Sequence, residues 1–162
     1  MPLSKSSLAQ ALEDVYSHRP SSSPQAASDW ARAYVSYASG ATSPTGGLPV
    51  SAMAGLPLLT GAFTGALNVL TSAGSAGVMA QGVTAFWQTI VWVGPAYAGV
   101  TTVPGNFALA GALAAVFADL DKKSARDKAS AVADAFDAGA KVVMVMDTLL
   151  APPFTPVVGP IS

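Results

Sequence analysis

Two absences define this sequence: it has no cysteine, and it has no charged side chain or histidine between Ala33 and Ala118. The lack of cysteine excludes disulfides, thiolate metal sites and cysteine nucleophiles. Charged residues make up 10% of the chain, whereas soluble proteins have about a quarter. Because hydrated groups normally cover a water-facing surface, we expect residues 33–118 to face lipid, partner subunits or the core. We also expect that a chain of 162 residues cannot bury the whole stretch within itself.

The scarcity of titratable side chains argues against catalysis. His18 is the only imidazole and lies among prolines and serines, so neither a histidine-rich zinc site nor a Ser-His-Asp triad is expected. Glu13 and Asp14 would point about 100° apart on a helix, and Asp119 and Asp121 lack the spacing of a calcium loop. No glycine-rich phosphate loop follows a strand pattern. We therefore predict a protein that is not an enzyme, with no catalytic, cofactor-binding or metal-binding residues.

The charge balance also limits the class of partner. The formal net charge is −1, and the basic residues do not cluster strongly enough to neutralise a nucleic acid backbone. We expect no nucleic acid partner and no small-molecule substrate, which leaves protein subunits or lipid as the candidates.

The apolar periodicity predicts a mainly α-helical single domain with five or six helices. The clearest helix has its apolar stripe from Ala27 to Ala38, and Ser23-Pro24 supplies an N-cap and a first-turn proline. The other helices are expected at about residues 5–17, 57–72, 75–93, 107–120 and 125–140.

One or two short strands are expected beside these helices. Residues 97–103 are β-branched and lie between Gly-Pro and Pro-Gly, and residues 142–146 either extend the preceding helix or form a strand. We divide the chain into an N-terminal helical arm and linker (1–23), a helical core domain (24–146) and an extended C-terminal arm (147–162). Because this last segment is rich in proline, we expect it to form no backbone ladder.

A membrane hairpin is one explanation of the uncharged stretch. Residues 50–72 and 76–93 are uncharged, and basic residues lie on both sides of them, as the positive-inside rule requires. Gly61 and Gly65 form a GxxxG match that would pack two such helices together. Against this, Pro57 interrupts the first candidate span, and the mean hydropathy of +0.46 is low for a leucine-rich membrane segment.

Burial against other protein subunits is the explanation that we favour. Small residues suit close packing, neutral polar side chains can pair across an interface, and a proline-rich arm orders on a neighbour at modest entropic cost. We expect anchors of the core or interface among the aromatic residues, namely Trp30, Tyr34, Phe63, Phe86, Trp87, Trp92 and Phe154. If Trp87 or Trp92 lies at a contact, aspartate in its place is expected to abolish assembly without loss of expression. A small-ligand-binding helical module remains a further alternative.

Part of the chain resembles small structural proteins of tailed bacteriophage particles. The resemblance rests on the alanine-rich helix from Asn106, the charged break at 119–123, the restart at Ser124-Ala125, the run 133–137, the segment 141–145 and the terminal residues 158–161. It implies a neck, tail or baseplate subunit of a virion that acts by shape, contacts copies of itself and other structural subunits, and has no catalytic residues. Among phage proteins, a holin-like hairpin in the inner membrane is the alternative.

Overall fold

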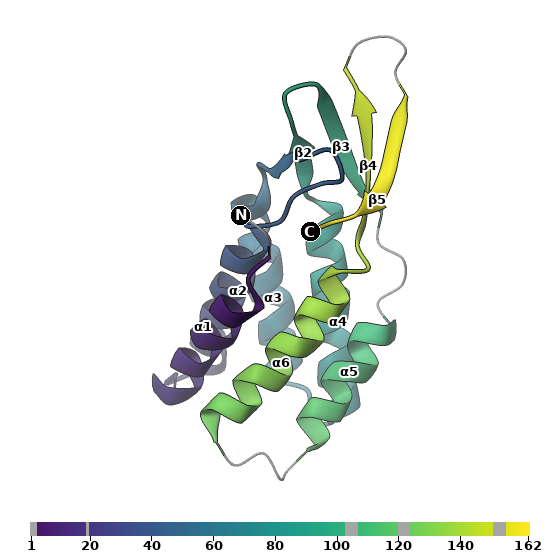
Figure 1. Ribbon diagram of the computed structural model, residues 1–162. Coiled ribbons are helices and arrows are strands. Elements are labelled where there is room, and N and C mark those ends of the chain that lie inside the picture. The colour runs from purple at the N-terminus through teal and green to yellow at the C-terminus, as the bar shows by residue number, and fades with distance from the viewer. Residues whose placement is uncertain (1–2, 19, 103–106, 120–123, 151–154) are drawn as a thin grey trace.

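The helices form a bundle, and a small antiparallel sheet stands at one end of it in this computed structural model (Figure 1). The structure describes residues 3–18, 20–102, 107–119, 124–150 and 155–162. Its six α-helices are α1 (Lys5–His18), α2 (Ser23–Ala38), α3 (Leu56–Leu67), α4 (Ser72–Gln88), α5 (Phe107–Ala118) and α6 (Ala125–Ala140), and a short 3-10 helix, η1 (Ala52–Gly55), precedes α3. The prediction of a mainly helical chain is therefore confirmed.

The sheet has more strands than the sequence predicts. Its five strands are β1 (Leu48–Pro49), β2 (Val91–Val93), β3 (Tyr97–Thr102), β4 (Met144–Leu149) and β5 (Pro156–Pro160), and each pairs antiparallel with the next in this order. The strand predicted at 97–103 is confirmed as β3. The helix predicted to run to Val93 is wrong at its end, because α4 stops at Gln88 and the following residues form β2. A short apolar run is compatible with both the helical and the strand repeat of apolar residues. Here residues 91–93 form a strand because they pair with β3.

The C-terminal segment is only partly the extended arm that was expected. Residues 147–149 belong to β4, and β5 pairs with β4 from Met144–Pro160 to Thr148–Pro156, so the expectation of no backbone ladder is wrong. At the other end of the chain, the helix of the expected N-terminal arm lies in the bundle as α1. Leu8 and Leu12 of α1 are fully buried.

Side-chain caps begin four of the helices, and at α1 the Ser4 hydroxyl accepts from the Ser7 backbone N–H at 3.3 Å. The Ser22 hydroxyl accepts from the Gln25 backbone N–H at the start of α2, one residue before the predicted cap, and Thr71 does the same for Gly74 at α4. Ser124 caps α6 through the Asp127 N–H at 3.0 Å, as the sequence predicts. Each cap satisfies a backbone donor that has no partner inside the helix.

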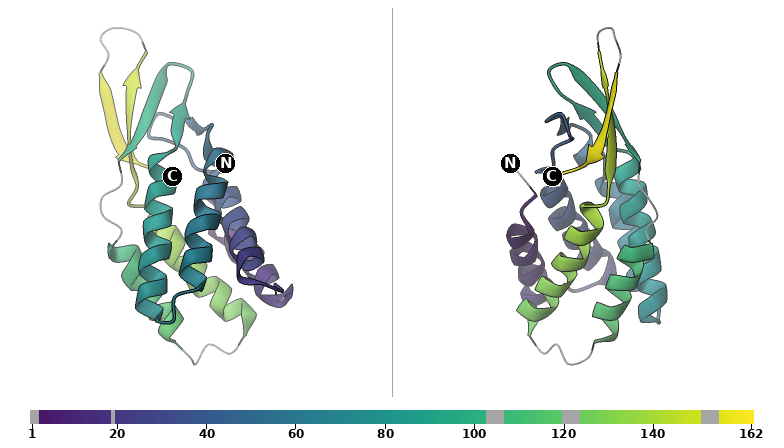
Figure 2. Two further views of the ribbon diagram at one scale, coloured as in Figure 1. Left: turned by 180° about the vertical axis from the view of Figure 1, so that it is seen from behind. Right: turned by 45° about the vertical axis from the view of Figure 1, so that its right-hand side comes forward.

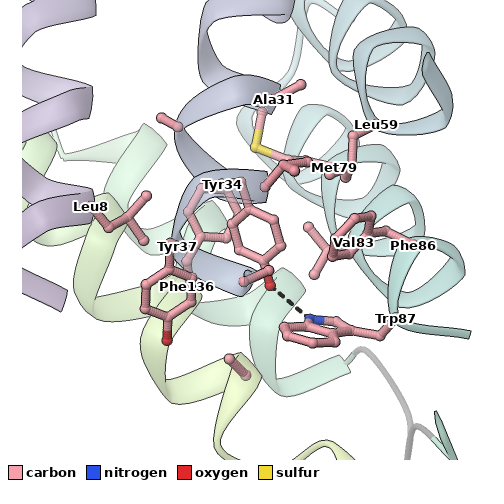
Figure 3. Packing of buried hydrophobic residues seen from close by; sticks show 14 of the residues in the cluster. Leu8, Ala31, Tyr34, Tyr37, Leu59, Met79, Val83, Phe86, Trp87 and Phe136 are labelled. Atoms are coloured by element: carbon pink, nitrogen blue, oxygen red, sulfur yellow. Dashed lines mark hydrogen bonds between the residues drawn. The ribbon is translucent and has the colours of Figure 1, made fainter. Parts of the chain in front are cut away.

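Aromatic side chains from α2, α4 and α6 meet in the core (Figure 3). Phe63 of α3 stacks on Phe136 with the ring centroids 6.1 Å apart. Tyr34 lies at the centre of this core, where its ring is 4.8 Å from that of Phe136 and its hydroxyl accepts from Trp87 Nε1 at 2.8 Å. Burial raises the pKa of Tyr34, so the phenol stays neutral. Because α3 and α4 belong to the uncharged stretch, the chain buries much of that stretch within itself, which is more than the sequence suggests.

A close approach of α3 and α4 lies beside the GxxxG match rather than at it. A Cβ placed at Gly61 would meet nothing within 4 Å, and one at Gly65 would make only an ordinary contact with Val78. In contrast, a Cβ at Gly82 of α4 would lie 2.3 Å from the Cβ of Ala62. The α3–α4 pair therefore uses Ala62 and Gly82 to bring its backbones together, one position along from Gly61.

Gly82→Ala is expected to destabilise the protein, because the added methyl group must push α3 and α4 apart. We expect a loss of about 1–3 kcal/mol in the free energy of unfolding. Gly77→Ala in the same helix is the matched control, since its Cβ would meet nothing within 4 Å. This control should gain about 0.5–1 kcal/mol from helix propensity. Urea unfolding of both variants checks the opposite signs, and a stabilised Gly82→Ala variant would contradict the close contact.

Candidate functional site

The sheet has one face packed on the helices and one face turned away from them. Trp92 of β2 points inward, where its ring stacks on that of Trp87 in α4 with the planes at 2° and the centroids 6.1 Å apart. Side chains alternate along a strand, so the neighbours of Trp92 in β2, Val91 and Val93, point outward. Both are exposed, in contrast to Trp92.

A continuous row of apolar side chains crosses this outward side. The register places Val91 opposite Val100, Val100 opposite Met146, and Met146 opposite Val158, and directly opposed residues share a face. Val100 is 54% exposed and Val158 is 58% exposed. We call the exposed residues of this side the outer apolar face: Leu48, Val91, Val93, Val100, Met146 and Val158.

The rest of the outward side is also uncharged. The register adds Ala98, Thr148 and Pro156 to it in one row and Met144 and Pro160 in another, and none of these positions carries an acid or a base. Val50 and Met53, which follow β1 towards α3, are 65% and 66% exposed. Adjoining apolar positions of this kind, with no charge among them, mark an interaction surface more often than a solvated one.

Prolines limit hydrogen bonding at both edges of the sheet. Ile161 N–H bonds to Val143 C=O, so the N–H positions of residues 156, 158 and 160 point away from β4. Two of these three are prolines, which leaves Val158 as the only outward donor of β5. At the other edge, Val50 N–H bonds to Val91 C=O. The backbone nitrogen of the preceding residue, Pro49, therefore points away from β2 and could not donate to an added strand. Addition of another strand at either edge is therefore disfavoured.

A buried carboxylate holds a loop against the inner face. Asp147 in β4 is 1% exposed, and its Oδ2 accepts from the hydroxyls of Ser43 and Thr45 at 2.5 and 2.6 Å and from Thr45 N–H at 3.2 Å. Gly46 has a φ of 83°, a left-handed conformation that favours glycine and lets this loop turn. Ser43 Oγ in turn accepts from Gly47 N–H at 2.9 Å. Asp147 Oδ2 thus accepts three hydrogen bonds, and these bonds tie the loop at Ser43 and Thr45 to strand β4.

A second buried acid, Asp137, links α6 to α2. It accepts from the Tyr37 hydroxyl at 2.8 Å and forms an ion pair with Lys141 at 2.7 Å. Burial alone would raise the pKa of Asp137, but the hydrogen bonds from Lys141 and Tyr37 outweigh it and hold the pKa below its usual value. Burial and the bond to Asp137 raise the pKa of Tyr37. Asp137 is thus held as a structural anion, and the phenol of Tyr37 stays neutral at neutral pH.

An apolar groove of about 530 Å³ lies at the end of the bundle opposite the sheet. It forms where the end of α1 and the start of α2 meet the connection between α3 and α4, which the rear view in Figure 2 shows far from the strands. Its lining comes from Val15, Tyr16, Pro20, Ala26, Trp30, Leu67, Val69, Leu70, Thr71, Ser72, Ser75 and Phe117. No acid, base or histidine is among these residues, so the groove offers apolar surface and a few hydroxyls.

The aromatic anchors predicted from the sequence lie inside the chain's own core. Trp30, Tyr34, Phe63, Phe86, Trp87 and Trp92 are all buried, and Phe154 lies outside the described residues. The exposed apolar positions of the sheet were not predicted. The outward valines beside the inward tryptophan in Val91-Trp92-Val93 are typical of a strand, but the predicted helix over residues 75–93 included these three residues.

The described part of the chain offers neither a metal-binding cluster nor a membrane-spanning helix. It contains no cluster of three or more His, Cys, Asp or Glu side chains placed to hold a metal ion. Within the same residues, no helix combines the length and the apolar character needed to cross a membrane.

Comparison of the chain with protein-family models, with curated proteins and with solved structures gave no match.

Proposed function

We propose that this chain is a non-enzymatic structural subunit that packs in multiple copies within a larger particle. The observation that carries the proposal is the outer apolar face, a set of exposed apolar side chains on five strands with no charge among them. Transfer of such surface out of water contributes about 25 cal/mol per Å² of apolar area. An isolated subunit would not gain this stabilisation, and its exposed apolar surface would promote association with other proteins.

The exposed apolar residues are concentrated in the uncharged stretch. Among the described residues, ten of the fifteen large hydrophobic residues that are exposed lie between positions 33 and 118: Leu48, Val50, Met53, Leu58, Leu67, Val69, Leu70, Val91, Val93 and Val100. The missing charge therefore has two physical causes. Part of the stretch is the subunit's own core, and the remainder is surface that other subunits cover.

The geometry of the sheet favours face-to-face packing over strand addition. Prolines occupy outward positions of both edge strands, so a further strand would find few N–H donors there. A face without charge can pack on a second uncharged face and leave no ion desolvated. We infer that the outer apolar face is covered by a face of another subunit.

The particle that we propose is a bacteriophage virion. The support is the sequence resemblance to small structural proteins of tailed phages, together with a surface suited to assembly and buried acids that act as structural links. Under this proposal the partners are copies of the chain and other virion subunits, and the subunit sits in the neck, tail or baseplate. Mass spectrometry of purified particles from the source phage would find the chain as a component in several copies.

Val100→Lys tests the role of the outer apolar face. Lysine at the centre of the face would place an unpaired charge in the contact, and we expect the assembly to fall to a small oligomer. Ser130→Lys adds the same charge at an exposed position on α6 and should leave the size unchanged. Light scattering without detergent gives the mass, and circular dichroism verifies that both variants fold. A Val100→Lys variant as large as the parent would contradict the proposed contact.

A further inference from the structure

The C-terminal strand is held to the rest of the chain by few side-chain contacts. Among residues 155–162, all of which the structure describes, Ile161 has the one buried side chain, at 4% exposed. Gly159 is buried but has no side chain, and Val157 and Val158 are exposed. β5 is the last strand of the described sheet, where it pairs with β4 alone. An element with so little buried apolar surface opens more readily than the core.

The place that β5 occupies accepts a particular sequence. A Cβ at Gly159 would lie 2.9 Å from Cγ of Pro44, so a residue with a side chain does not fit there unless the loop moves. Two residues later, the side chain of Ile161 is buried. Ser162 then forms two backbone hydrogen bonds with Thr42, at 2.9 and 3.1 Å. A strand that replaces β5 must therefore present a glycine and, two residues on, an apolar side chain.

We propose that two copies of the chain exchange this strand, so that residues 156–162 of one copy take the place of β5 in another. The fit identifies the occupant, because the segment that meets the requirements at Gly159 and Ile161 is already in place within each chain. Strand exchange repeats these contacts between copies, which makes it a low-cost route to association. Within a particle, neighbouring copies have a high effective concentration, which favours strand exchange over simple opening.

The prolines of β5 limit the result to replacement of one strand by another. Pro156 and Pro160 direct their nitrogens away from β4, so an exchanged β5 pairs with one β4 and ends the sheet as it does within one chain. Reciprocal exchange joins two copies in a closed pair, whereas one-way exchange continues from copy to copy. This inference rests on the proposed function and names one way in which the copies are joined.

Hydrogen exchange tests whether β5 opens separately from the rest of the sheet. Alternate N–H groups of β4 face its two neighbours: those of Val145 and Asp147 face β5, and those of Met146 and Thr148 face β3. In the Val100→Lys variant, we expect protection factors about tenfold lower for the first two amides than for the second two, with less dependence on urea. Equal protection with equal urea dependence would mean that β5 leaves only when the sheet unfolds, and would overturn strand exchange.

Disulfide trapping tests whether the strand reaches a second copy, because the chain has no cysteine of its own. Met146 and Val158 are exposed and directly opposed in a pair without mutual backbone hydrogen bonds, a spacing that suits a disulfide. Two full-length chains are co-expressed, one with Met146→Cys and one with Val158→Cys. Both carry Val100→Lys, which removes cross-links through the outer apolar face. We expect a disulfide-linked dimer of twice 16.2 kDa that contains one copy of each chain.

Each cysteine variant expressed alone is the matched control, because exchanged strands do not place two identical cysteines opposite each other. A mixed dimer without dimers in the controls supports strand exchange. Absence of the mixed dimer, or equal dimer formation in the controls, would overturn strand exchange. The proposed function would still stand if the parent chain assembled. A parent chain that is monomeric at high concentration would instead overturn the proposed function and strand exchange with it.

Discussion

Replacement of Asp147 with alanine is expected to lower the free energy of unfolding by about 3 kcal/mol or more. The carboxylate is the shared acceptor for the hydroxyls of Ser43 and Thr45 and for Thr45 N–H. Its removal leaves three donors without their acceptor in a region that water barely reaches, and each lost bond to a charged group is worth about 1.5–3 kcal/mol. Chemical denaturation followed by circular dichroism measures the change.

Ser43→Ala is the graded control for this prediction. It removes one of the three bonds to Asp147 and also the bond that Ser43 Oγ accepts from Gly47 N–H, but it keeps both bonds from Thr45 to Asp147. We therefore expect a loss of about 1–2 kcal/mol, smaller than that of Asp147→Ala. Hydrogen exchange at the amides of Thr45 and Gly47 should accelerate in both variants, because the loop is released from the sheet. If Asp147→Ala were no less stable than Ser43→Ala, the carboxylate would not be the link that holds the loop.

Trp87→Ala is expected to cost about 3–5 kcal/mol of stability, the range for loss of a large aromatic side chain from a core. The indole is 1% exposed, stacks on Trp92 and donates its N–H to the Tyr34 hydroxyl. The alanine variant therefore leaves a cavity between the bundle and the sheet and removes a buried hydrogen bond. Thermal unfolding of the variant would show the loss as a lower midpoint.

Trp87→Phe separates the two contributions. It keeps most of the ring area and removes the N–H, so we expect a loss smaller than that of Trp87→Ala. The near-ultraviolet circular dichroism signal of the stacked Trp87–Trp92 pair should weaken in both variants. A Trp87→Ala protein as stable as the parent would show that the indole does not join the sheet to the bundle.

The structure also corrects the expectation for aspartate at these positions. From the sequence, Trp87→Asp and Trp92→Asp are expected to abolish assembly without loss of expression. Both side chains are buried in the subunit's own core, so an aspartate there would carry an unpaired charge into it and prevent folding. Loss of assembly in such variants would not identify a contact, whereas a substitution at exposed Val100 can.

The helical part of the fold is well predicted by local signals in the sequence. Apolar residues recur at helical spacing from Ala27 to Ala38, and Ser124 forms the cap that its position before α6 suggests. These signals are local because a helix satisfies its own backbone hydrogen bonds. They therefore need no knowledge of the tertiary structure.

The sheet is less predictable because its strands are stabilised by distant partners. Val91 pairs with Val100 across a tight connection, but Val100 pairs with Met146 and Met146 with Val158, which lie far apart or in a proline-rich segment. Nothing near Ser43 in the sequence indicates that it will bond to Asp147. The residues of the outer apolar face come together only through these pairings, so they cannot be recognised from the sequence, whereas the large aromatic residues can.

The mass of the parent chain in solution, without detergent and over a wide range of concentration, tests the central claim most directly. Sedimentation equilibrium should give a mass several times 16.2 kDa that rises with concentration, because other copies cover the outer apolar face. A single species of 16.2 kDa at the highest concentration would contradict the account. The exposed valines would then be ordinary surface, and the uncharged stretch would be explained by the core alone.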